Sequence, residues 1–210
     1  FIENKLTKKN KLNKYLVKEF KKRNIWVASS THAGEEKFCS QTHIELKKRI
    51  KNLTTIIIPR HIHRVDQIVS EIKNLNLKVD LHSSKKSRLN LTDIYIVDTF
   101  GDTQDFHKIA SSVFLGGSVI KRGGQNPLEA ARFGAKILHG PNIDNFKDIY
   151  KKLKSLKISV RVTTPKKLAS SIVFEKNKYM GDKIKNIGTK IFKKTIKELD
   201  SIINNELKKT

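Results

Sequence analysis

The stretch GGSVIKRGGQNPLEAA, residues 116–131, decides how the fold of this chain is predicted. It follows a short apolar segment and carries two glycine pairs ahead of a helix-starting pattern. Asn126 is a favoured N-cap and Pro127 a favoured first helical residue, so a helix is expected to begin there. The free N–H groups of a helix start bind anions, usually phosphate. The stretch therefore predicts either a phosphate-binding loop or a plain tight turn between a strand and a helix.

Outward from this stretch, segments typical of buried strands alternate with segments of helical pattern. The expected strands are 25–28, 54–58, 77–81, 93–97, 113–115, 136–138 and 159–162. The expected helices are 36–52, 63–74, 105–111, one opened by Asn126, 145–156 and one led by Pro165. Several strands are uniformly apolar, which is typical of parallel strands covered on both faces. The pattern predicts an α/β fold with a doubly wound, Rossmann-like parallel sheet, and ligands of such folds bind at the carboxyl ends of the strands.

The length of 210 residues suits one α/β domain with appendages. We expect residues 1–23 to be a connecting helix, 24–175 the Rossmann-like domain and 176–210 a C-terminal helical segment, with its long helix over 182–207. The chain begins with Phe1 rather than Met, so we expect it to be part of a longer protein. No apolar run approaches the roughly 18 residues of a membrane span, and we expect a soluble fragment. The single cysteine, Cys39, excludes an internal disulfide and fits a helix face.

The formal charge of +24 invites a nucleic-acid interpretation. The excess is mostly lysine spread along the whole chain, whereas nucleic-acid binders usually cluster arginine and interleave aromatic residues on one face. We therefore expect a solvated basic surface and no nucleic-acid partner. An acidic membrane surface and a negatively charged sugar nucleotide both remain suitable partners.

Three further motifs follow expected strands, at the same edge of the sheet as the glycine-rich stretch. In SSTHAGEE, residues 29–36, Ser30, Thr31 and His32 are candidate ligand contacts, and Ser30 or Thr31 is alternatively a helix cap. In PRHIHR, residues 59–64, Arg60 can grip a phosphate or carboxylate in bidentate fashion.

The same motif holds a histidine pair, and a third motif follows the next strand. His61 and His63 have no acidic or cysteine partner nearby in the sequence, so they support a metal site only weakly. In DTFGD, residues 98–102, the glycine permits close approach of a base or sugar, or else the segment is a simple capped turn.

In this order, the four motifs closely resemble the C-terminal domain of 3-deoxy-D-manno-octulosonic acid (Kdo) transferases. These are GT-B glycosyltransferases that move Kdo from CMP-Kdo to a lipid A precursor. The resemblance covers about residues 26–150. It implies that the chain is the C-terminal, donor-binding half of such an enzyme, acting in lipopolysaccharide biosynthesis at the cytoplasmic face of the bacterial inner membrane.

The resemblance also implies which residues bind the donor. The residues implied to bind CMP are Pro59, Arg60, Phe100, Gly101, Asp102, Asn126, Pro127, Leu128 and Glu129. Further candidate contacts of the donor are Ser30, Thr31, His32, Gly117, Ser118 and Gly124. Where this chain has Phe100 and Asp102, the family usually has Met and Glu, which puts a side-chain role at Asp102 in doubt.

The implied reaction is direct glycosyl transfer, with Arg60, the helix start at Asn126 and the glycine loops stabilising the phosphate charge of the leaving CMP. The family's general base and its lipid acceptor site belong to an N-terminal domain. No catalytic residue is therefore expected in this chain, which would be inactive alone. The donor has a single phosphate and no Asp-x-Asp cluster follows a strand, so no metal or other cofactor is expected.

Three alternatives stay open. The chain could serve a GT-B transferase with a UDP-sugar donor. It could be a non-catalytic basic module that binds nucleic acid or acidic membrane, insensitive to changes at Gly123, Gly124 and Asn126. It could also be a stand-alone remnant that binds nucleotide without turnover.

Overall fold

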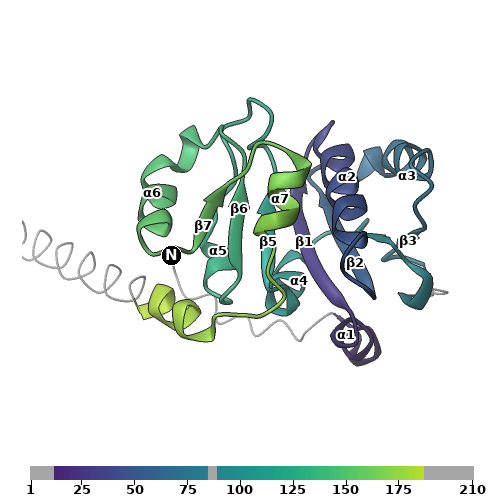
Figure 1. Cartoon of the computed structure of the whole chain (residues 1–210), viewed down its shortest axis with the longest axis horizontal. Helices are drawn as coiled ribbons and strands as arrows, with labels where there is room; N and C mark the ends of the chain where they lie inside the picture. The colour runs from purple at the N-terminus through teal and green to yellow at the C-terminus, as the bar shows by residue number, and fades with distance from the viewer. Residues whose placement is uncertain (1–11, 85–88, 187–210) are drawn as a thin grey trace, which may run out of the picture.

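A computed structural model describes residues 12–84 and 89–186. Within these ranges, a seven-stranded sheet has the order β3-β4-β2-β1-β5-β6-β7, and all paired neighbours run parallel (Figure 1). The strands are β1 (Asn24–Thr31), β2 (Leu53–Pro59), β3 (Val79–Leu81), β4 (Ile94–Ile96), β5 (Ser112–Leu115), β6 (Lys136–His139) and β7 (Ser159–Arg161). The predicted α/β fold with a doubly wound parallel sheet is confirmed.

Helices connect the strands and cover both faces of the sheet. The α-helices are α1 (Lys14–Lys21), α2 (Glu35–Lys47), α3 (Val65–Lys73), α4 (Thr103–Ile109), α5 (Leu128–Ala131), α6 (Lys147–Ser155) and α7 (Pro165–Ser171). Short 3-10 helices are η1 (Ile62–Arg64), η2 (Leu89–Leu91) and η3 (Asp144–Phe146). None of these described helices has the length and apolar character needed to cross a membrane.

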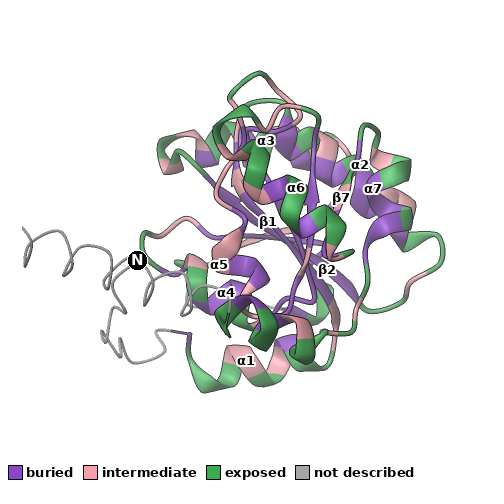
Figure 2. Ribbon diagram, turned by 90° about the vertical axis from the view of Figure 1, so that its left-hand side faces the viewer, coloured by how far each residue is buried: buried purple, intermediate pink, exposed green. Residues whose placement is uncertain are grey.

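The sheet separates two apolar cores, because alternate residues of each strand point to opposite faces. On one face, residues such as Trp26, Ile57 and Phe114 pack with α2, α3 and α7. On the other face, residues such as Val27 and Tyr95 pack with α1, α4, α5 and α6. Figure 2 shows the buried strands between the two helical layers. Burial on both faces explains why the strand sequences are apolar without alternation.

The strand order places a topological switch point between β1 and β5. From β1 the chain first builds the half of the sheet that holds β2, β4 and β3, and it then returns to the other side of β1 to add β5, β6 and β7. Ligands of open parallel sheets bind outside the carboxyl ends of the strands at such a point. The loops after β1 and β5 therefore line the expected binding crevice.

Three helix boundaries differ from the sequence prediction. Helix α2 ends at Lys47 rather than Asn52, because Asn52 takes a left-handed turn conformation (φ 51°) at the entrance to β2. The helix after Asn126 is a single turn, because the chain turns at Gly134 (φ 78°). The last helix is already formed from residue 178, and of the predicted 182–207 helix only 182–186 falls within the described residues.

Candidate functional site

The ends of β1, β2 and β5 meet at the carboxyl edge of the sheet. The Arg60 N–H donates to the Thr31 carbonyl at 2.9 Å, and the Gly116 N–H donates to the Ser29 carbonyl at 2.9 Å. A Cβ on Gly116 would lie 2.2 Å from the Ser30 carbonyl oxygen. The first glycine of the motif is thus required for two strand ends to approach, and the loops after β1, β2 and β5 form one surface.

A buried carboxylate, that of Glu35, fills the turn formed by the first glycine pair. Its Oε2 accepts hydrogen bonds from the Gly117 N–H at 2.7 Å and the His32 N–H at 3.0 Å. Its Oε1 accepts from the N–H groups of Ser118 at 3.1 Å and Val119 at 3.0 Å. The N–H groups expected to cradle a phosphate at Gly117 and Ser118 are therefore occupied by the protein's own anion.

The neighbouring carboxylate, that of Glu36, is paired with Arg64 of the PRHIHR motif. Glu36 is fully buried and accepts from both terminal nitrogens of Arg64, at 3.0 and 3.4 Å. This bidentate pair joins α2 to η1. Arg64 is thus a structural residue, and the helix cap predicted at Ser30 or Thr31 is in fact Gly34 (φ 89°).

Unpaired cations remain at this edge. Arg60 is exposed, and no hydrogen bond or ion pair of its guanidinium occurs among the described residues. The His32 ring lies 5.7 Å from that of His61, and His61 lies 5.6 Å from His63. Burial, helped by the nearby charges of His61 and Arg122, lowers the pKa of His32. His32 thus lies among basic side chains, an environment that suits an anionic ligand.

The second glycine pair fixes the loop that carries Arg122 and Gln125. Gly123 and Gly124 have φ angles of 77° and 75°. The Gly124 N–H donates to the Gly117 carbonyl at 2.9 Å, and Tyr150 donates to the Gln125 carbonyl at 3.0 Å. Gly124 is buried, so its contribution is to fold the loop back onto the first glycine pair.

The start of α5 holds the last predicted CMP-binding stretch. Asn126 Oδ1 accepts from the Leu128 N–H at 3.0 Å, so Asn126 caps the turn although Pro127 occupies the N-cap position. The Glu129 side chain is half-buried in the first turn, and among the described residues no hydrogen bond or ion pair engages its carboxylate. Glu129 is thus free to bind a hydroxyl group.

In the loop after β4, both acidic side chains accept hydrogen bonds from the protein and the aromatic ring is exposed. Asp98 accepts from the Ser83 N–H at 2.8 Å, and Asp102 accepts from the Thr99 hydroxyl. Phe100 is 73% exposed. Gly101 has a φ of 87°. The Phe100 ring is thus accessible to a flat group such as a base.

Some candidate donor contacts have structural partners instead. Ser118 is buried, donates to the Leu115 carbonyl at 2.5 Å and accepts from the Gly140 N–H at 2.8 Å. Ser30 is half-buried in a left-handed conformation (φ 56°) at a bulge of β1. Thr31 is buried, and its hydroxyl has no hydrogen-bond partner among the described residues.

Sequence reasoning gave no role in ligand binding to Glu35, Arg122 or Gln125. The sequence shows a glycine followed by two acids at a helix start and an arginine between two glycine pairs, but neither pattern alone indicates what these side chains contact. Which acid fills which turn depends on long-range contacts, since Glu35 and Gly117 are 82 residues apart.

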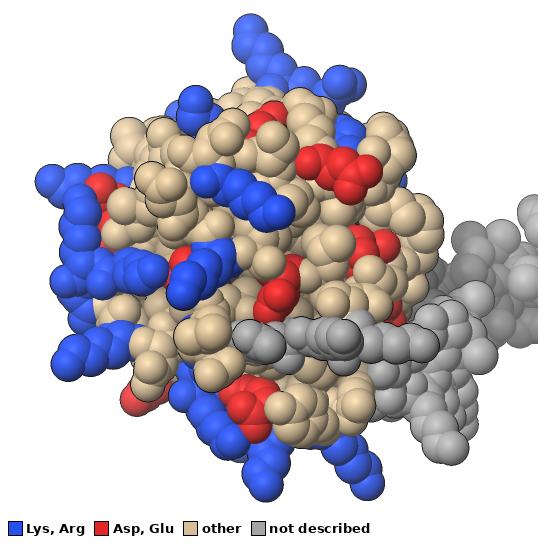
Figure 3. Space-filling view, turned by 90° about the vertical axis from the view of Figure 1, so that its right-hand side faces the viewer, with Lys and Arg blue, Asp and Glu red and all other residues tan. Residues whose placement is uncertain are grey.

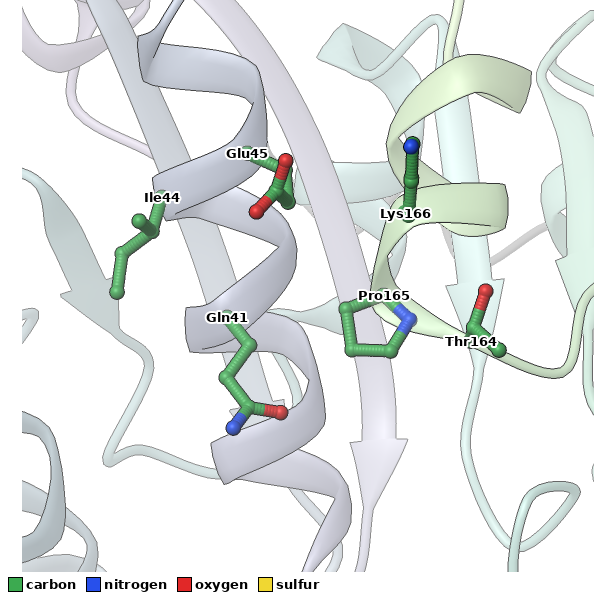
Figure 4. A pocket seen from close by; sticks show the side chains of 6 residues that line it. All are labelled: Gln41, Ile44, Glu45, Thr164, Pro165 and Lys166. Atoms are coloured by element: carbon green, nitrogen blue, oxygen red, sulfur yellow. The ribbon is translucent and has the colours of Figure 1, made fainter.

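Two hollows lie away from this edge. A groove of about 330 Å³ between α2 and α7 is lined by Gln41, Ile44, Glu45, Thr164, Pro165 and Lys166 (Figure 4). A second hollow, of about 470 Å³, lies at the amino ends of the strands beside Arg23, Lys78 and Asp93. None of the predicted CMP contacts lines either hollow. Among the described residues no group of three or more acidic, histidine or cysteine side chains is placed to hold a metal ion.

The surface charge is dispersed rather than gathered into one patch on the face drawn in Figure 3. Lys and Arg side chains project at its margins, and acidic groups are interspersed between them. Such a surface favours anionic partners in general and selects none of them.

The chain is similar in sequence to Kdo transferases. It is 30% identical over 131 residues to the 3-deoxy-D-manno-octulosonic acid transferase of Haemophilus influenzae, which covers 62% of this chain and 31% of that protein. It is 32% identical over 170 residues to the Rickettsia prowazekii enzyme of the same name, covering 81% of this chain and 36% of that protein. The chain thus spans about a third of the length of these curated relatives. No protein-family model matches it.

A solved structure shares the fold. The C-terminal CMP-Kdo binding domain of WaaA from Acinetobacter baumannii superposes with a TM-score of 0.68 at 24% identity, over 75% of this chain and 84% of that domain. Together with the sequence similarity, this makes the chain a relative of the Kdo transferases that has the fold of their C-terminal domain.

Proposed function

We propose that this relative of the Kdo transferases is the donor-binding part of a glycosyltransferase that uses CMP-Kdo. The relatives are 3-deoxy-D-manno-octulosonic acid transferases, and the solved domain that shares the fold is a CMP-Kdo binding domain. The observation that carries the proposal is the unpaired Arg60, which is exposed at the carboxyl end of β2 near His32 of the loop after β1. A cation so placed suits the single phosphate of a CMP-sugar.

In this proposal each free group of the edge has a role toward the donor. The Arg60 guanidinium binds the phosphate, the exposed Phe100 ring stacks on the cytosine, and the Glu129 carboxylate accepts from ribose hydroxyls. Backbone groups of 59–60, 100–102 and 126–129 complete the nucleotide site. Once it binds the phosphate, the Arg60 guanidinium stabilises the charge that grows there as CMP leaves.

The domain organisation remains part of the proposal. Residues 1–23 would lead from a domain that supplies the general base and the acceptor lipid, 24–175 would bind the donor, and 176–210 would close the C-terminal side. We propose a lipid A precursor as acceptor and the cytoplasmic face of the inner membrane as location, supported by the basic surface and the names of the relatives. This part is tested by an assay of Kdo transfer. The protein that contains this chain is given CMP-Kdo and acceptor lipid in vesicles, and transfer of Kdo to the lipid is measured.

Replacement of Arg60 by alanine tests the nucleotide site. We expect CMP affinity measured by calorimetry to fall by about 1.5–3 kcal/mol, the scale of a lost charge-assisted hydrogen bond, or roughly tenfold to a hundredfold in Kd. Arg161→Ala, at an exposed arginine of the edge strand β7, is the matched control and should leave the Kd unchanged. An unchanged CMP affinity in Arg60→Ala would remove Arg60 from the site, and tighter binding of UDP than of CMP would favour a UDP-sugar donor.

A further inference from the structure

Two residues that follow β3 hold both acidic side chains of the loop after β4. The Ser83 N–H donates to Asp98 Oδ1 at 2.8 Å, and the Ser83 hydroxyl donates to Asp98 Oδ2 at 2.5 Å. Nε2 of His82 lies 3.9 Å from Asp102 Oδ2. The loop that exposes Phe100 is therefore held at both ends by two residues that lie outside the four sequence motifs.

The Asp102 carboxylate serves this loop rather than the helix that follows it. Asp102 occupies the N-cap position of α4, yet its side chain makes no capping hydrogen bond. An aspartate at that position usually accepts from a backbone N–H in the first turn of the helix. Here Oδ2 instead accepts from the Thr99 hydroxyl and faces His82. Because the bond between Thr99 and Asp102 closes the turn over Phe100 and Gly101, the orientation of Asp102 determines how that turn is presented.

The imidazole ring of His82 is itself held in place. Its Nδ1 lies 2.9 Å from the hydroxyl of Tyr95 on β4. The ring centroid lies 5.8 Å from that of Tyr95 and 5.4 Å from that of Phe106 on α4, edge to face in both cases. Tyr95 and Phe106 are fully buried. The ring therefore has a defined position between the sheet and α4, from which Nε2 faces the loop.

Tyr95 also determines which ring nitrogen of His82 carries the proton. Burial, helped by the charges of Asp80 and Asp98, raises the pKa of the Tyr95 hydroxyl, so this group keeps its proton. A buried hydroxyl needs an acceptor, and among the described residues the Tyr95 hydroxyl has its hydrogen bond to Nδ1 of His82. Nδ1 thus accepts, and the proton of the neutral ring lies on Nε2, where it can be donated to Asp102.

We propose that His82 is a positioning residue: its Nε2–H group holds the Asp102 carboxylate, and thereby the turn with Phe100, in the form that binds the nucleotide. The inference rests on the proposed function, because the form of this turn matters to the ligand only if the base binds there. His82 does not touch the nucleotide but acts through Asp102. A substitution that keeps a donor at the place of Nε2 should therefore preserve binding, whereas one that keeps only the ring should weaken it.

Two substitutions of His82, compared by calorimetry with CMP, test the inference. His82→Phe keeps an aromatic ring against Tyr95 and Phe106 but has no donor for Asp102. We expect its Kd for CMP to rise about fivefold, the scale of one lost hydrogen bond. His82→Gln offers an amide donor to Asp102 and an acceptor to Tyr95, so its Kd should stay within about twofold of wild type.

A double variant and a matched control separate positioning from general stability. In an Asp102→Ala background, His82→Phe should change the Kd for CMP by less than about twofold, because the residue through which His82 acts is already lost. Ser112 is also a buried polar residue, and its hydroxyl donates to the Val173 carbonyl and accepts from the Val173 N–H at the amino end of β5. Ser112→Ala should lower the melting temperature and leave the Kd for CMP unchanged.

The outcomes distinguish this inference from the proposed function. If wild type and His82→Phe bind CMP equally well, the inference is wrong and the nucleotide site stands. If His82→Phe and His82→Gln weaken CMP equally, the donor is not what holds the loop, which also overturns the inference. If wild type binds no CMP, the proposed function fails and the inference fails with it. Should His82→Phe not fold, Tyr95→Phe takes its place, since it frees the His82 proton to move to Nδ1, and an unchanged Kd there would contradict the inference.

Discussion

At the scale of single residues, one buried carboxylate organises the site. Glu35 begins α2 and satisfies four N–H groups from the loops after β1 and β5. Its 0% exposure means that each of these bonds forms away from competing water. Glu35 therefore couples the two loops at the switch point, and the position of His32 depends on it.

The contribution of Glu35 is measurable in its amide variant. Glu35→Gln places an NH₂ group against N–H donors, so we expect the free energy of unfolding to fall by about 3 kcal/mol, a typical loss for charged hydrogen bonds with their donors left buried. Glu45→Gln on the same helix removes only a solvent-exposed pair with Lys48 and should cost less than about 0.5 kcal/mol. Urea unfolding of the two variants compares them, and equal losses would deny Glu35 this role.

At the scale of elements, the approach of β1 to β5 shapes the crevice. The sequence predicted both strands, their apolar character and the loops that follow them, because these depend on local patterns. It did not predict that α5 would be a single turn or that Gly34 would cap α2, because these depend on where the chain must turn to reach the next strand. The sequence predicted a phosphate-binding loop, whereas the N–H groups of Gly117, Ser118 and Val119 bind the Glu35 carboxylate of α2.

Alanine substitutions at Gly116 and Gly34 form a matched pair that tests the close approach of the ends of β1 and β5. A Cβ on Gly116 would overlap the Ser30 carbonyl, whereas a Cβ on Gly34 would meet nothing within 4 Å despite its φ of 89°. We expect Gly116→Ala to cost about 3 kcal/mol through overpacking. Gly34→Ala should cost only the left-handed strain, about 1–2 kcal/mol. Chemical unfolding measures both, and the reverse order would mean that the strand ends separate easily.

At the scale of the whole molecule, the sheet keeps a histidine neutral beneath the site. His107 on α4 is 2% exposed, and its Nε2 lies 3.1 Å from the Ser29 hydroxyl of β1. Burial, with a smaller contribution from Lys176, lowers its pKa from 6.5 to about 4. In the unfolded chain His107 therefore becomes protonated near pH 6.5, whereas in the folded protein it is protonated only near pH 4.

Acid should therefore destabilise the protein in that window. Stability from this group is complete above pH 6.5 and declines as the pH falls to about 4, by up to about 3 kcal/mol at 1.36 kcal/mol for each pH unit. His32 and His139, whose pKa values are also lowered by burial, act in the same direction. In His107→Gln, urea unfolding at pH 7 and pH 4.5 should show a clearly smaller difference than in wild type. If the stability difference between pH 7 and pH 4.5 is the same in His107→Gln and in wild type, groups other than His107 cause the pH dependence.

The fold and the similarity to Kdo transferases were accessible from the order of four motifs, because each motif follows a strand and parallel strands end at one edge of the sheet. The sequence did not predict which groups at this edge stay unpaired and which form internal hydrogen bonds. The Arg60 and Glu129 side chains are unpaired among the described residues and Phe100 is exposed, whereas Ser118 and the N–H group of Gly117 form internal hydrogen bonds. Such pairings join residues far apart in the chain, so local sequence patterns do not predict them.

The central claim is that this chain binds CMP at the carboxyl edge of its sheet. Titration of the ¹⁵N-labelled protein with CMP, followed by NMR at near-physiological salt, tests it most directly. We predict saturable shifts of the amide signals of Arg60, Phe100–Asp102 and Leu128–Glu129, with the signals around Arg23 and Lys78 at the opposite edge unmoved. Absence of shifts at millimolar CMP, or shifts spread over the lysine-bearing surface and abolished by salt, would contradict the account and favour a basic module without a nucleotide site.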